Sequence, residues 1–75
     1  LKTSFKIENG PVGRMEIRFT EKRHTHSIHV LVESESAKTE VQKILPQVQH
    51  NLIQKGMHLN TINVTVTNFA TTPEQ

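Results

Sequence analysis

The sequence predicts an α+β fold, a small mixed β-sheet of about four strands in the order β-β-β-α-β with one amphipathic helix packed on one face. Two observations lead to this prediction. Apolar residues recur at every second position in segments before residue 33 and after residue 59, and at helical spacing between residues 37 and 52. The length of 75 residues leaves room for one hydrophobic core and no second domain.

The first two expected strands are separated by a turn. Phe5 and Ile7 alternate with polar residues, which predicts a strand at residues 2 to 8. An Asn-Gly-Pro sequence at residues 9 to 11 then interrupts the pattern. Alternation resumes from Arg14, with Met15 and Ile17 on one side of a second strand.

A third strand follows a polar stretch of hairpin-loop length at residues 21 to 24. Ile28, Val30 and Val32 occupy alternate positions after that loop. We therefore expect the second and third strands to pair as an antiparallel hairpin.

The helix is predicted by apolar residues that share one helical face: Ala37, Val41, Ile44, Leu45, Val48 and Leu52. Ser36 is the expected N-cap, and Gly56 is the expected C′ residue. Pro46 lies within the helix and removes one backbone hydrogen bond, so we expect a kink or a break into two short helices there.

The last strand is expected at residues 59 to 67, where Ile62, Val64 and Val66 alternate with polar residues. We assign residues 1 to 70 to a single domain and residues 71 to 75 to a polar tail. A single helix covers only one face of such a sheet, so the other face is expected to meet water or a partner.

Composition excludes several kinds of site. The chain has no Cys, which rules out disulfides, thiolate zinc sites and cysteine nucleophiles. It has no apolar run near 18 residues, so we expect no membrane insertion. Nine Lys and Arg against seven Asp and Glu give a net charge of only +2, with the acidic residues interleaved among the basic ones.

Residues suited to catalysis or metal binding are sparse. His24 and His26 lie on the same side of an extended segment, with His29 opposite, which is too few ligands for a closed zinc site. Ser34 and Ser36 have no evident His and acid to activate them. We therefore expect no enzyme activity, no cofactor, no metal and no small-molecule substrate.

Nucleic-acid binding is the alternative to protein binding. Arg14, Arg18, Lys22 and Arg23 would suit a small RNA-binding or ribosome-associated module. The chain has no Tyr or Trp, however, and single-strand binders of the sheet type stack bases on aromatic side chains. We therefore expect a protein partner, and nucleic acid is the less favoured reading.

Two stretches of the chain resemble the C-terminal domain of flagellar hook-length control proteins, the substrate-specificity switches of type III export. Residues 5 to 19 are similar to a strand end followed by the family's Leu-Gly motif, with Val12 and Gly13 in the Leu-Gly place. The second stretch contains Leu45 and Pro46 and ends in Gly56-Met57-His58-Leu59, similar to the end of the family's helix and the strand after it. The family usually has Pro where this chain has Asn9.

The resemblance implies a role in the bacterial cytoplasm, with export through the flagellar type III apparatus. The domain would be the C-terminal part of a longer protein and would contact the cytoplasmic domain of the export-gate switch protein. That contact would change export from hook and rod substrates to filament substrates.

The expected partner-binding residues are Val12, Gly13, Arg14 and Arg18. They combine an apolar turn residue with two cations one strand repeat apart, which suits an acidic and partly apolar surface. The alternative is that Val12 lies beneath the helix and that both arginines are merely solvated.

Overall fold

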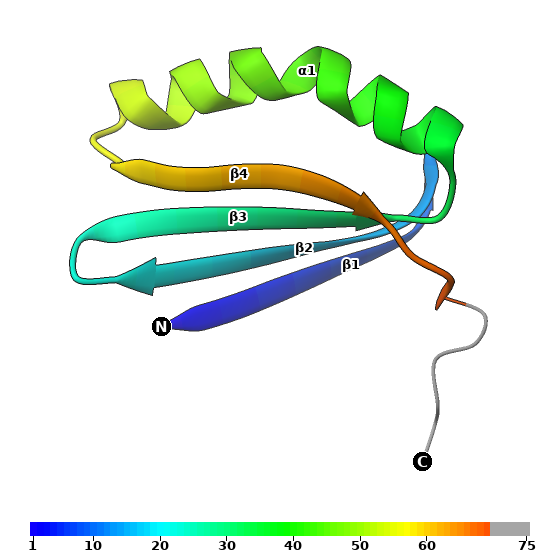
Figure 1. Cartoon of the computed structure of the whole chain (residues 1–75), viewed down its shortest axis with the longest axis horizontal. Coiled ribbons are helices and arrows are strands. Elements are labelled where there is room, and N and C mark those ends of the chain that lie inside the picture. Colours follow the sequence, from blue (N-terminus) through cyan, green and yellow to red (C-terminus); the bar gives the residue numbers. More distant parts are fainter. Residues whose placement is uncertain (70–75) are drawn as a thin grey trace.

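Four strands and one helix follow one another in the computed structural model, which describes residues 1–69 (Figure 1). They are β1 (Lys2–Gly10), β2 (Gly13–Lys22), β3 (Thr25–Val32), α1 (Glu35–Gln54) and β4 (Leu59–Val66). This order and the mixed sheet confirm the α+β prediction. The expected polar tail at residues 71 to 75 lies outside the described residues.

The strands lie side by side in the order in which they occur in the chain, β1-β2-β3-β4. β1 pairs antiparallel with β2 and β2 with β3, whereas β3 and β4 are parallel and are connected by α1. One register line across the sheet joins Phe5, Ile17, Val30 and Val64. Because side chains alternate between faces, the apolar residues of the four strands share the face that carries the helix, apart from Leu31, which is buried on the opposite face between Glu16 and Thr65.

The core lies between α1 and the half of the sheet formed by β3 and β4. Its buried residues are Ile28, Val30, Val32, Ala37, Val41 and Val64. The helix packs chiefly on β4 and to a lesser extent on β3, and Figure 1 shows it running along that side of the sheet. Strands are ~4.8 Å apart and a helix with its side chains is ~10 Å wide, so one helix covers about two strands.

The ends of α1 are set by one serine and one glycine. The side chain of Ser34 caps the N-terminus by accepting a hydrogen bond from the Ala37 N–H at 3.1 Å, so the prediction of Ser36 as N-cap is wrong by two residues. Gly56 has a φ of 94° and is the C′ residue, as predicted. The N–H groups of Gly56 and Met57 donate to the carbonyls of Ile53 and Leu52, which is the Schellman pattern.

The helix continues through Pro46 as one element from residue 35 to residue 54, so the predicted break does not occur. Pro46 is exposed, and so is Ile44, at 56% of its surface. The prediction that Ile44 belongs to the core face is therefore wrong. Ile44 lies at the margin of the apolar stripe of α1, where β3 and β4, the strands that the helix covers, do not bury it.

Both hairpin connections are tight. β2 and β3 are joined by Arg23 and His24 alone, with φ values of 52° and 68°. The expected loop at residues 21 to 24 is therefore shorter than predicted, because its first two residues complete β2. The β1–β2 turn ends at Gly13, whose φ of 84° also lies in the left-handed region.

Candidate protein-binding surfaces

Val12, Gly13, Arg14 and Arg18, here called the turn patch, extend from the β1–β2 turn along β2. Val12 is half-buried and packs against the margin of the core. It lines a shallow hollow together with Ser34 and Ala37 at the start of α1. This position matches the alternative interpretation of Val12, in which the side chain lies under the helix.

Gly13 is required by its backbone conformation. Its positive φ disfavours any residue with a Cβ. A Cβ at this position would meet the Glu33 carboxylate, but that carboxylate is the end of a flexible side chain and can move aside. The sequence signal for this site was the glycine itself, since left-handed turn positions are usually occupied by Gly.

The two arginines project from the sheet face opposite the helix and are each held by a neighbouring carboxylate. The Nε of Arg14 is 2.9 Å from Glu8, and the Nε of Arg18 is 3.0 Å from Glu16. Arg14 also lies over the Phe69 ring, 5.8 Å from its centroid. A guanidinium has five N–H donors, so an ion pair through Nε engages only part of each group.

A surface that the sequence prediction missed lies on the helix side of β1, which we call the β1 apolar edge. Leu1, Phe5 and Ile7 are 80%, 59% and 39% exposed there. The alternation of Phe5 and Ile7 predicted a strand with one buried face, but the helix covers the far half of the sheet. The sequence did contain a signal for this surface, because a single predicted helix cannot cover a whole face of a sheet of four strands.

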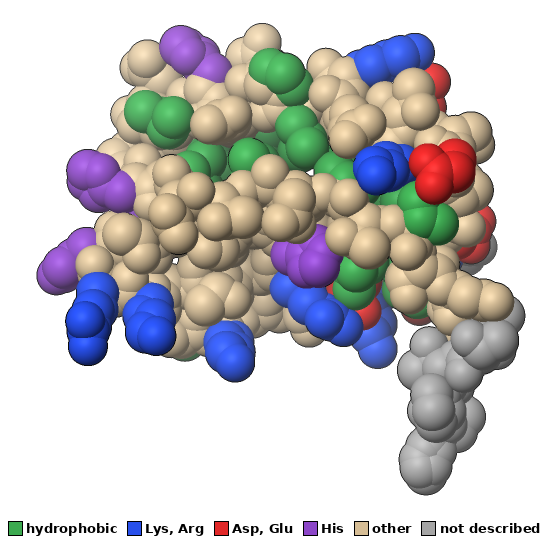
Figure 2. Space-filling view, in the orientation of Figure 1, with side chains coloured by type: hydrophobic (Ala, Val, Ile, Leu, Met, Phe, Trp, Pro, Cys, Tyr) green, Lys and Arg blue, Asp and Glu red, His purple; other side chains and the backbone are tan. Residues whose placement is uncertain are grey.

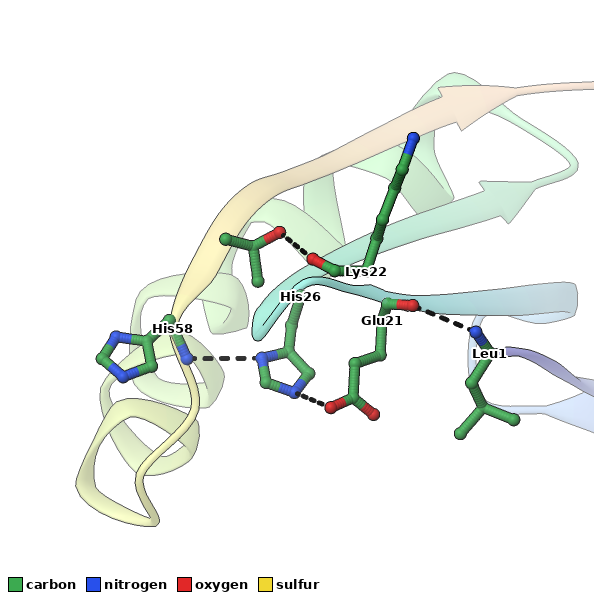
Figure 3. Close-up of polar contacts among 6 residues, drawn as sticks. Leu1, Glu21, Lys22, His26 and His58 are labelled. Carbon is green, nitrogen blue, oxygen red and sulfur yellow. Dashed lines mark hydrogen bonds and ion pairs between the residues drawn. The ribbon is translucent and has the colours of Figure 1, made fainter.

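His26 and His58 form a structural contact at the end of the sheet near the β2–β3 turn (Figure 3). His26 accepts a hydrogen bond at Nδ1 from the His58 N–H at 3.3 Å, and its Nε2 lies 3.7 Å from the Glu21 carboxylate. Its ring packs on Phe19 at 5.5 Å between centroids. His26 therefore joins β2, β3 and the segment leading into β4.

The other residues considered for metal binding or catalysis lie apart from the contact between His26 and His58. His29 lies on the opposite face, 2.8 Å from the Thr65 hydroxyl, and His24 is exposed in the hairpin turn. Among residues 1–69, no group of three or more His, Cys, Asp or Glu side chains is placed to hold a metal ion. Ser34 is engaged as the helix cap.

Within the described part of the chain, no helix has both the length and the apolar character needed to cross a membrane. Comparisons of the chain with protein-family models, with curated proteins and with solved structures return no match.

Proposed function

We propose that this chain is a protein-binding switch domain like that of flagellar hook-length control proteins. In this role it contacts the cytoplasmic domain of the type III export-gate switch protein and changes export from hook and rod substrates to filament substrates. It acts in the bacterial cytoplasm and is itself exported through the flagellar apparatus. No catalytic step is part of this role.

The resemblance gains support from where its two motifs fall. The Val12-Gly13 motif contains one glycine with positive φ, and the Gly56-Met57-His58-Leu59 motif contains the other. Each glycine ends a turn or a helix at a point where a side chain would be strained. The motifs thus coincide with backbone positions on which this strand and helix order depends.

The observation that carries the proposal is the arrangement of the turn patch. Arg14 and Arg18 are exposed, lie on one face of β2, and are fixed by Glu8 and Glu16. Side chains already held in place lose less entropy when a partner binds. The patch therefore suits an acidic partner surface that competes for the two guanidinium groups.

Binding to the purified export-gate cytoplasmic domain, measured by calorimetry, tests this proposal. We expect the double variant Arg14→Glu, Arg18→Glu to bind at least tenfold more weakly while circular dichroism remains unchanged. Lys22→Glu with Arg23→Glu is the matched control, because it makes the same charge change at the far end of the hairpin. Absence of wild-type binding at high micromolar concentration contradicts the proposed partner, and equal loss in both variants contradicts the turn patch.

The basic side chains also favour a second candidate, an RNA-binding module. Figure 2 shows Lys and Arg gathered along the border where β1 and β2 run. Glu8 and Glu16 stand among them and reduce the local field. RNA binding that weakens steeply with salt, without binding to the export-gate domain, would favour this second candidate.

A further inference from the structure

β1 is an edge strand with an apolar face, and it carries the features of a strand that pairs with a copy of itself. Within residues 1–69 it has a sheet neighbour on one side only, β2. Phe5 and Ile7 are exposed beside that free edge, whereas the opposite edge strand, β4, is packed against α1. Free edges with exposed apolar residues are templates for pairing with another chain.

The hydrogen-bond pattern shows which backbone groups of β1 are free. The Leu1 nitrogen donates to the Glu21 carbonyl at 3.0 Å, and the Glu21 N–H donates to the Leu1 carbonyl at 2.8 Å. In an antiparallel ladder, residue pairs that exchange both bonds alternate with pairs that exchange none. The backbone groups of Lys2, Ser4 and Lys6 therefore point away from β2.

We infer that two copies of this chain pair antiparallel through β1, with Phe5 facing Phe5 across the two-fold axis, which we call the Phe5-centred pairing. It joins the two sheets into one and uses none of the four residues of the turn patch, which it adjoins at Glu8. The axis passes between the two Phe5 residues, whose backbone groups form hydrogen bonds to β2 of their own copy. The two residues therefore face each other without hydrogen bonds between them, and side chains approach most closely at such pairs. Each Phe5 then covers the exposed ring of the other.

The charges of β1 favour this register. Lys2 of one copy lies opposite Glu8 of the other, and two-fold symmetry repeats the pair. Both side chains project on the face opposite the helix, where Glu8 already contacts Arg14. Lys6 lies opposite Ser4, so no like charges are directly opposed.

Neighbouring registers are less favourable. Only shifts by two residues keep the free backbone groups of both strands opposite one another. Centring on Lys6 opposes two Lys6 side chains, and centring on Ser4 opposes Lys2 and Lys6, which destabilises the pairing. Centring on Ile7 opposes Phe5 and Ser4 to residues 9 and 10 and so spans the whole irregular segment between Ile7 and Gly10, whereas the Phe5-centred pairing reaches only Glu8 in that segment.

The first test uses sedimentation of the 75-residue chain over a concentration series. A single strand pair buries less than the ~800 Å² per partner of a standard complex, so we expect a dimer with a Kd of ~0.1–1 mM. Ser4→Pro removes one outward N–H and no bond to β2, and should abolish dimerisation. Ser4→Thr keeps the N–H and should leave the dimer intact. A wild-type chain that stays monomeric at several millimolar overturns the inference.

The second test reverses the charges of Lys2 and Glu8. It remains informative even if the Ser4→Pro variant does not fold. Lys2→Glu and Glu8→Lys, each alone, oppose like charges and should weaken the homodimer at least fivefold. An equimolar mixture of the two variants restores opposite charges and should form a heterodimer with near wild-type affinity. If the mixture remains as weakly associated as each variant alone, the Phe5-centred pairing is wrong.

Discussion

The β2–β3 turn is the position where a double substitution should stabilise this fold most clearly. Arg23 and His24 form a two-residue connection with φ values of 52° and 68°. Positive φ at both positions is typical of a type I′ turn, which strongly prefers Asn followed by Gly. We expect Arg23→Asn with His24→Gly to raise the stability of the domain.

The size of the gain follows from the backbone. A non-Gly residue in the left-handed region costs ~1–2 kcal/mol, so two such residues store ~2–4 kcal/mol. Asn keeps part of that strain, and Gly adds ~0.5–1 kcal/mol of conformational freedom to the unfolded chain. The expected net gain is about 1–2 kcal/mol, a rise of ~4–15 °C in Tm for a domain of this size.

Thermal melts followed by circular dichroism measure this rise. Arg23→Ala with His24→Ala is the control, because both side chains are exposed and the alanines keep the two Cβ atoms that cause the strain. The control should melt within about 3 °C of the wild type or below it. A double variant with Asn and Gly that melts no higher than the alanine control would refute the assignment of strain to this turn.

Two further stability predictions concern the core and the helix cap. Val32 is fully buried, at 0% exposure, so Val32→Ala should cost ~2–3 kcal/mol, while Ile44→Ala on the exposed helix surface should cost less than ~0.5 kcal/mol in urea unfolding. Ser34→Ala should cost ~1 kcal/mol through loss of the hydrogen bond to the first turn of α1, and a larger cost from Ser36→Ala would contradict the cap assignment.

Most of the fold could be predicted because each element has a strong local signal. The period of the apolar residues gave the order of the strands and the helix, and Gly56 marked the end of the helix. The N-cap was misplaced because Ser34 and Ser36 both precede the apolar helical pattern. The sequence does not show at which of the two serines the helix begins. Pro46 did not break the helix because tertiary packing of the apolar face outweighs the loss of one hydrogen bond.

The candidate site could be predicted less completely, because its geometry depends on contacts between strands. The sequence placed Arg14 and Arg18 on one face of a strand, but it did not show that Glu8 lies beside Arg14, since that pair depends on the register of β1 against β2. The sequence also did not show how short the β2–β3 turn is. Arg23 and His24 are not residues by which a type I′ turn is recognised.

The difference between the pattern of β1 and its surroundings links the fold to the dimer inference. Alternation reports which face of a strand is apolar, and it does so whether or not anything in the same chain covers that face. In β3 the helix supplies the cover, and Val30 and Val32 are buried. In β1 the same alternation leaves Phe5 exposed at an edge whose backbone groups are also free. A strand that is patterned for burial and left uncovered is the place where local and global requirements disagree, and such places are expected at functional surfaces.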